Sequence, residues 1–133
     1  MIKMKRISAA VIVLCMLLAL APAAAFAAVT ASGSCGENVT WAYDSGTKTL
    51  TISGTGDMES YTEYSNAPWY SCYSDYIENV SIETGVTSIG DYVFFWCDKI
   101  ASISIPNSVK SIGSHAFDCC KALKNITIPD GVE

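Results

Sequence analysis

The residues best able to do chemistry lie together in one short stretch near the C-terminus. His115, the single histidine, comes just before Cys119 and Cys120. A histidine beside a thiol is typical of a nucleophilic pair, and both residue types also bind zinc. However, His115 and Cys120 fall at positions of an internal repeat, where Tyr92 and Cys97 are their equivalents. No second histidine is available for a zinc site, so we expect no catalytic residue, no metal, no cofactor and no enzyme activity.

A run of aromatic residues in the middle of the chain forms a second candidate site. Six aromatic side chains lie close together there: Tyr61, Tyr64, Trp69, Tyr70, Tyr73 and Tyr76. Exposed aromatic side chains anchor partners, whereas buried ones pack a core. The sequence favours packing for Trp69 and leaves both alternatives open for the tyrosines. The candidate partner-binding residues are Tyr61, Tyr64, Tyr70 and Tyr73.

The elements that must position these residues repeat with a period of 23 residues. Residues 80–102 and 103–125 form two units with eight identical positions, and a third unit begins at Ile126. Alternating pairs such as Val80 and Ile82 predict one short, half-buried strand per unit. The apolar spacing after Gly90 and Gly113 predicts one turn of 3₁₀- or α-helix. Stacked units should place their strands in parallel, about 4.8 Å apart.

A β-hairpin is predicted before the repeats. Residues 39–43 and 49–53 alternate between apolar and polar side chains, and the turn-forming stretch 44–47 separates them. A repeat array needs its open end covered, and this hairpin would cover it. In the repeats, alternation turns a small hydroxylated column outward, made of Ser81, Ser104 and Thr127.

The first 27 residues have the segment order of a secretory signal peptide. A basic start precedes an apolar run over residues 7–20 and the cleavage-type triplet Ala25-Phe26-Ala27. We expect cleavage and export, with no membrane span left afterwards. Export permits disulfides, and five cysteines remain in the mature chain. Cys35 and Cys72 are the candidate disulfide, because both lie in or beside the predicted hairpin region.

The charge of the mature chain limits its partners. All 13 acidic residues but only five lysines follow the predicted cleavage site, which leaves a net charge of −8. An acidic surface repels phosphate backbones, so nucleic acid is excluded as a partner.

The second unit resembles the repeat of BspA-like leucine-rich repeat proteins of bacterial surfaces. It matches that pattern at every specified position: Ile103, Ile105, Pro106, Val109, Ile112-Gly113, Ala116-Phe117, Cys120 and Leu123. The resemblance implies a β-rich α/β solenoid, a right-handed leucine-rich-repeat coil with parallel strands and short helical turns, capped by the hairpin. The expected organisation is a signal peptide at 1–27, a cap with an aromatic loop at 28–78, and repeats at 79–133.

The resemblance also implies a role in recognition. It predicts a secreted or cell-surface protein for adhesion or protein–protein recognition, whose partner is a protein of the host matrix or of another cell, or a glycan. The alternative is a spacer or targeting module of a larger secreted enzyme. Because the third unit stops at Glu133, we expect more sequence to follow in the intact protein, and its nature separates the two hypotheses.

Overall fold

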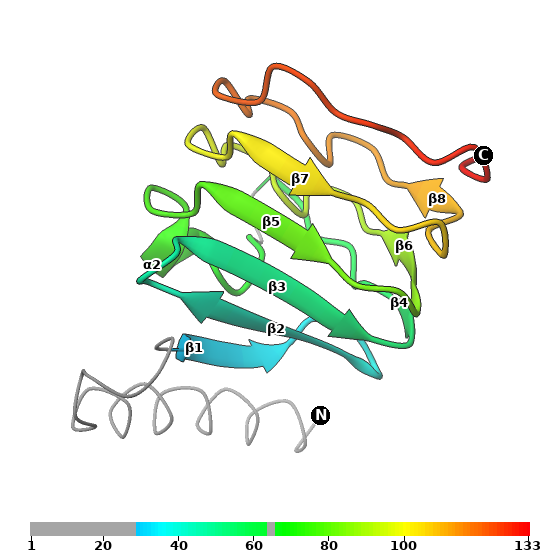
Figure 1. The fold of residues 1–133 in the computed structure, drawn as a ribbon, viewed down its shortest axis with the longest axis horizontal. Coiled ribbons are helices and arrows are strands. Elements are labelled where there is room, and N and C mark those ends of the chain that lie inside the picture. Colours follow the sequence, from blue (N-terminus) through cyan, green and yellow to red (C-terminus); the bar gives the residue numbers. More distant parts are fainter. Residues whose placement is uncertain (1–28, 64–65) are drawn as a thin grey trace.

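The computed structural model describes residues 29–63 and 66–133, so the predicted signal peptide lies outside the described part. These residues form two sheets (Figure 1). The larger contains, in spatial order, β1 (Val29–Ser34), β2 (Val39–Asp44), β3 (Thr49–Gly54), β5 (Asn79–Ile82) and β7 (Ser102–Ser104). The smaller contains β4 (Gly56–Asp57), β6 (Val86–Ile89) and β8 (Ser111–Ile112). Over these same ranges, no helix is long and apolar enough to cross a membrane.

Strands β2 and β3 form the predicted hairpin. They pair antiparallel, with Trp41 opposite Ile52, and both of these side chains are buried on the same face. In the turn, the Oδ1 atom of Asp44 accepts a hydrogen bond from the backbone N–H of Gly46 at 2.7 Å. The hairpin extends the sheet sideways, because β3 pairs in parallel with β5.

Each repeat unit supplies strands to both sheets. Strands β5 and β7 pair in parallel with Val80 opposite Ile103, and β6 pairs in parallel with β8, with Ile89 opposite Ile112. Successive units therefore stack in the register that the 23-residue period predicts. A glycine is required at position 90, because a Cβ atom there would collide with the backbone of the segment stacked below it.

Residues 49–61 form a repeat-like segment that the 23-residue period does not reveal. Its strands β3 and β4 pair with β5 and β6, so it occupies the place of a unit before the first one. The backbone N–H of Tyr61 also donates to the carbonyl oxygen of Asp91 at 2.9 Å. Thr49 pairs with Asn79, an offset of 30 residues, and this different spacing hides the relationship in the sequence.

Strand β1 was not predicted from the sequence. It pairs antiparallel with β2 at the edge of the sheet, with an irregularity between Val29 and Ala31. The stretch 31–34 contains only alanine, glycine and serine, which have little intrinsic preference for strands. Pairing with β2 therefore stabilises this strand.

The predicted short helical turns in the repeats are wrong. The segments after Gly90 and Gly113 are non-helical turns, and the one helix of the described residues is α2 (Tyr70–Tyr73). Left-handed backbone recurs in both units and interrupts any helix: Tyr92 φ 56°, Trp96 φ 60°, His115 φ 55° and Cys119 φ 62°. Each such residue costs about 1–2 kcal/mol.

Hydrogen bonds between the units offset part of this cost. The backbone N–H of Tyr92 donates to the carbonyl oxygen of Ser114 at 3.0 Å, and that of Trp96 donates to Asp118 at 2.9 Å. A helix would direct these N–H groups within their own segment. The turns instead form a third ladder of backbone hydrogen bonds between neighbouring units, in addition to the ladders of the two sheets.

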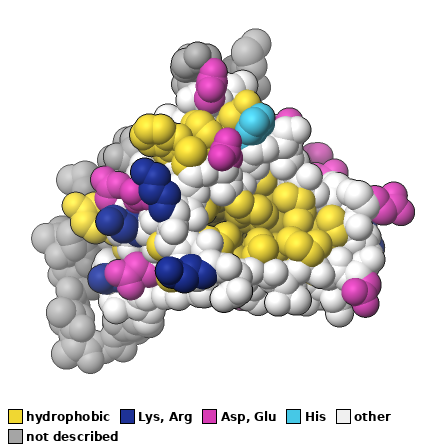
Figure 2. Space-filling view, turned by 90° about the horizontal axis from the view of Figure 1, so that it is seen from above, with side chains coloured by type: hydrophobic (Ala, Val, Ile, Leu, Met, Phe, Trp, Pro, Cys, Tyr) yellow, Lys and Arg dark blue, Asp and Glu magenta, His cyan; other side chains and the backbone are white. Residues whose placement is uncertain are grey.

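The third predicted repeat strand is also absent. The stretch 126–128 is not assigned as a strand, and Ile128 is 44% exposed. No described segment covers the outer side of this stretch. A regular strand would therefore bury little additional apolar area of its isoleucines. Figure 2 views the molecule from this side and shows a broad apolar area.

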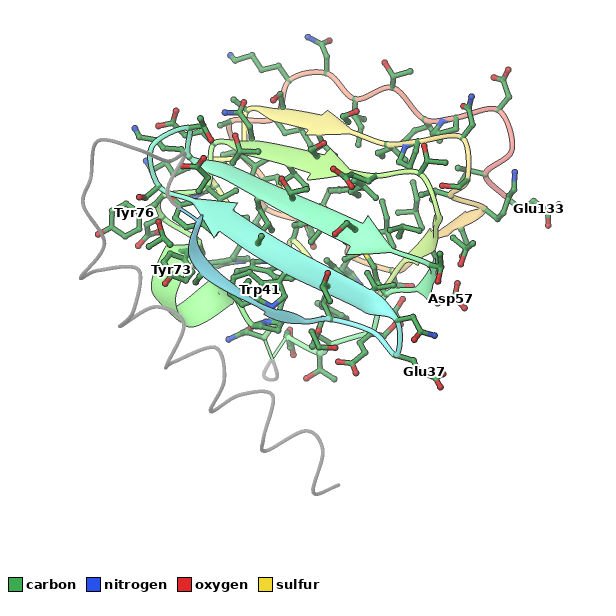
Figure 3. All side chains as sticks on the ribbon, turned by 60° about the horizontal axis from the view of Figure 1, so that its bottom comes forward. Glu37, Trp41, Asp57, Tyr73, Tyr76 and Glu133 are labelled. Atoms are coloured by element: carbon green, nitrogen blue, oxygen red, sulfur yellow. The ribbon has the colours of Figure 1, made fainter. Side chains whose placement is uncertain are left out.

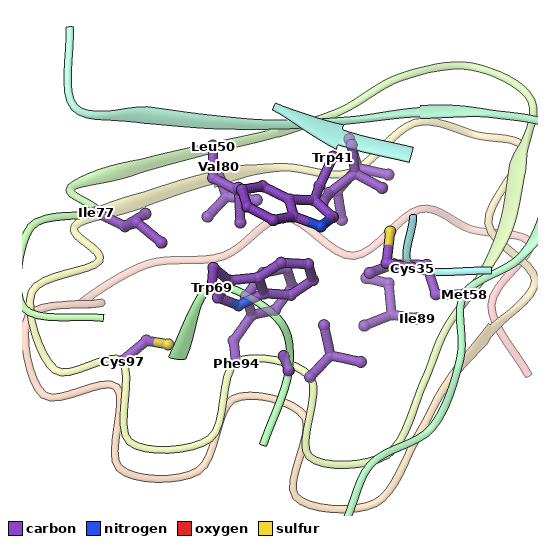
Figure 4. Close-up of a cluster of buried hydrophobic side chains, with 14 of the residues drawn as sticks. Cys35, Trp41, Leu50, Met58, Trp69, Ile77, Val80, Ile89, Phe94 and Cys97 are labelled. Carbon is purple, nitrogen blue, oxygen red and sulfur yellow. The ribbon is translucent and has the colours of Figure 1, made fainter. Parts of the chain in front are cut away.

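Aromatic rings connect the hairpin to the repeats through the core (Figure 4). Trp69 is fully buried, with its ring centroid 5.9 Å from Trp41 and 5.7 Å from Phe94. Phe94 in turn stacks on Phe117 of the second unit at 5.7 Å. Packing is thus confirmed as the role of Trp69, and each buried aromatic ring stabilises the fold by roughly 1.5–3 kcal/mol.

Candidate interaction surfaces

The tyrosines chosen as candidate partner-binding residues differ in their environment. Tyr61 packs partly against the core, and its hydroxyl donates to the Oε2 atom of Glu59 at 3.3 Å. Burial, with a smaller contribution from the charge of Glu59, raises the pKa of Tyr61 well above its usual range. Tyr61 therefore has a packing role whether or not it also contacts a partner.

Tyr73 lies on α2 against the hairpin, where its ring centroid is 4.7 Å from that of Tyr43 (Figure 3). Tyr70 is half-buried, and Tyr64 lies outside the described residues. Tyr76, which was not among the candidates, is the most exposed large apolar side chain of the described residues, at 62%. The structure leaves the binding role of these tyrosines a prediction.

The cysteines at equivalent repeat positions are buried, as the period predicts. Cys97 is 0% and Cys120 is 9% exposed, whereas Cys119 is half-exposed. Burial is the main cause that raises the pKa of Cys97 to about 12 and that of Cys120 to about 11. The Sγ atom of Cys120 donates to the carbonyl oxygen of Phe94 at 3.1 Å. Both thiols are therefore protonated near neutral pH and unsuited to nucleophilic chemistry.

The candidate disulfide between Cys35 and Cys72 stays a prediction. Cys35 is a buried thiol, and burial raises its pKa to about 12. The side chain of Cys72 lies outside what the structure describes.

His115 faces a carboxylate. Its Nδ1 atom lies 3.1 Å from the Oδ2 atom of Asp118, and its ring stacks on Tyr92 at 4.8 Å. The Sγ atom of Cys119 lies 3.8 Å from the other oxygen of Asp118. In the part of the chain that the structure covers, no group of three or more His, Cys, Asp or Glu residues is arranged to hold a metal ion.

The outer face of the larger sheet is hydroxylated, as alternation predicts. Thr51, Ser81 and Ser104 lie in register across β3, β5 and β7. Asn79 and Ser102 lie opposite each other on the neighbouring strands β5 and β7. Their side chains bond to each other, since the Oγ atom of Ser102 donates to the Oδ1 atom of Asn79 at 2.7 Å. This face offers a partner no large apolar anchor.

A group of aromatic rings, two exposed and two half-buried, lies on the turns of the two units. We call it the aromatic turn patch and define it as Tyr92, Phe95, Trp96 and His115. Trp96 is 57% exposed, and the rings of Tyr92 and Phe95 meet edge to face at 5.2 Å. Phe95 and Trp96 lie 6.2 Å apart. In Figure 2, apolar side chains lie on one side of His115, the cyan residue, and an acidic side chain lies beside it.

Sequence reasoning missed this patch, although a signal for it exists. Residues 93–96 are four consecutive apolar residues, where the repeat pattern needs only the pair equivalent to Ala116 and Phe117. The two extra side chains, Phe95 and Trp96, have no place in the core. They correspond to Asp118 and Cys119 of the second unit, which also indicates an exposed position.

Parallel strands stacked in a 23-residue register define a sheet-rich repeat protein. The family model for the BspA type leucine rich repeat region matches residues 65–133. The chain therefore belongs to the BspA-type leucine-rich repeat family.

The solved structures similar to this chain are bacterial leucine-rich repeat proteins. One, from Eubacterium ventriosum, is 35% identical with a TM-score of 0.60 and covers 65% of this chain. The chain spans only 23% of that protein. Another, from T. pallidum, is 21% identical with a TM-score of 0.47, over 75% of this chain and 51% of that one. No curated protein matches.

Proposed function

We propose that this chain is an exported, non-enzymatic recognition protein that attaches to another protein at the cell surface. Repeat folds present extended rigid surfaces, and leucine-rich repeats generally mediate protein recognition. The observation that carries the proposal is the exposure of an anchor-type aromatic side chain, Trp96, on this framework. Of the thiols that the structure describes, those of Cys35, Cys97 and Cys120 are buried, which makes them poor nucleophiles.

The proposed organisation follows the sequence. A signal peptide at 1–27 directs export, residues 28–78 cap the array, and residues 79–133 belong to a right-handed solenoid. The partner is a protein of the host matrix or of another cell surface, and the tyrosines of the cap loop are candidate contacts. The proposal also includes the disulfide between Cys35 and Cys72.

Binding of the secreted chain to an array of purified matrix proteins tests this function. We expect saturable binding to at least one of them, and no turnover of the bound protein. Hydrolysis of it, or an absence of saturable binding, would contradict the proposal and favour the alternative of a spacer in a larger secreted enzyme.

Two sets of variants test the cap-loop tyrosines once a ligand is known. Tyr61→Phe and Tyr70→Ser remove polar or aromatic contacts while keeping most of the packing. Ser81→Lys and Ser104→Lys change the sheet face instead. Circular dichroism first establishes that each variant is folded. Loss of binding only in the lysine variants would show that the partner binds the outer face of the larger sheet.

A further inference from the structure

We propose that the aromatic turn patch binds an arginine-bearing basic segment of the protein partner. This inference rests on the proposed recognition function and assigns it a site and a partner chemistry. The site lies on the turns of the repeats and shares no residue with the outer sheet face or with the cap-loop tyrosines.

The aromatic rings give the patch its affinity for a cation. The indole of Trp96 is the best side chain for cation–π contact, and a guanidinium stacks flat on such a ring. The other described tryptophans, Trp41 and Trp69, are 3% and 0% exposed. Phe95 lies beside Trp96, and Tyr92 meets Phe95 at a steep angle of 75°, so these rings extend the apolar surface in two directions.

The backbone holds these rings in place at a cost. Tyr92, Trp96 and His115 all have left-handed backbone, which bulky side chains rarely adopt and glycine adopts freely. Hydrogen bonds to the next unit fix Tyr92 and Trp96 in this conformation. The side chains therefore project from a preorganised ladder of turns, which lowers the entropy lost on binding.

A carboxylate beside the rings complements a basic partner. The side chain of Asp118 is 50% exposed, and its Oδ2 atom lies 3.1 Å from the Nδ1 atom of His115 in the patch. The backbone N–H of Trp96 also donates to the carbonyl oxygen of Asp118 at 2.9 Å, which places this residue next to Trp96. Within the described ranges, the ion pairs are Lys48–Glu78 and His115–Asp118, so no lysine neutralises Asp118.

A hexa-arginine peptide titrated into the secreted chain tests the proposal by calorimetry and tryptophan fluorescence. We expect saturable binding that weakens as salt rises, because exposed charges are screened. Trp96→Ala should weaken it about tenfold, as expected for an aromatic anchor, and Asp118→Asn should weaken it by a smaller factor. Each variant has a matched control: Tyr76→Ala removes an equally exposed ring outside the patch, and Glu83→Gln removes an exposed charge on the sheet side.

Three results would overturn the proposal. They are the absence of hexa-arginine binding, an equal loss in Trp96→Ala and Tyr76→Ala, and tighter Trp96-dependent binding of cellohexaose, which would make the ligand a glycan. The matrix-protein array separates this inference from the function on which it rests. If the Trp96→Ala chain still binds its matrix protein and hexa-arginine does not compete, the site is wrong while the recognition function stands. If hexa-arginine binds through Trp96 but the array contains no protein ligand, the site stands while the recognition function is wrong.

Discussion

The two complete repeat units have equivalent residues in different environments. In the first unit, Ile82 and Phe94 are 3% and 0% exposed, because the unit lies between the repeat-like segment 49–61 and the second unit. Their equivalents Ile105 and Phe117 are only partly buried, since one side of the second unit faces the first unit and the other side meets only the short segment 126–133. The apolar pattern is the same in both. The burial of a repeat residue is therefore set by its neighbouring units, and stability should follow the number of neighbours.

Truncating the stacked phenylalanines should give the largest difference between the units. Phe94→Ala should lower the free energy of unfolding by about 3–5 kcal/mol, as expected for a fully buried ring, and Phe117→Ala by about half as much. Urea denaturation of the two variants measures the difference. Equal losses would mean that the uncovered side of the second unit contributes as much as the covered one.

Adding a neighbour should remove the difference. A copy of residues 111–125 placed directly after Glu133 would complete the third unit in register and cover Ile112 and Phe117. We expect the melting temperature to rise by several degrees, since each newly buried apolar side chain contributes about 1.5–3 kcal/mol before the entropy of ordering is subtracted. A matched copy with serine at its strand isoleucine is the control. An unchanged melting temperature in the apolar version would argue against stability that depends on nearest neighbours.

The buried thiols offer a finer comparison of the same two units. Burial raises the pKa of Cys97 to about 12 and that of Cys120 to about 11, from 9.0 for a free thiol. The folded state thus holds its protons more tightly than the unfolded state, so stability is complete below about pH 9 and falls as pH rises towards those values. Cys97→Ala should flatten this fall more than Cys120→Ala does.

Alkylation of the native chain provides an independent measure of how deeply these thiols are buried. Half-exposed Cys119 should react first, Cys120 next and Cys97 last. Mass spectrometry of peptides from native and denatured samples determines the order. Rapid native labelling of Cys97 would show that its side of the unit opens to solvent.

The smallest effect is expected at the exposed turn positions, where the two units should behave alike. Trp96→Gly and Cys119→Gly relieve left-handed backbone at φ 60° and 62° and remove side chains that are at least partly exposed. We expect changes within about 0.5 kcal/mol of zero, with relief of strain offsetting the greater entropy of the unfolded glycine. A loss of more than about 1 kcal/mol at Trp96 alone would mean that its ring stabilises the fold, which would weaken its assignment to partner binding.

Local patterns in the sequence were sufficient for the parts of the fold that repeat or alternate. The register of Val80 with Ile103, the hairpin of β2 and β3 and the buried Cys97 all follow from a fixed period and from side chains that alternate between two faces. These features depend on residues close in sequence, or on the same residue one period later.

The tertiary structure decided the features that depend on which segments become neighbours. Strand β1 forms because a partner strand is present, and the segment 49–61 takes the place of a repeat unit for the same reason, although its sequence predicts only the strand at 49–53. The turns replace helices because the backbone N–H groups of Tyr92 and Trp96 bond to the adjacent unit. Exposure of Trp96 and the unequal burial of Phe94 and Phe117 likewise depend on neighbours, because hydrogen bonding and burial are completed between segments that no local pattern identifies.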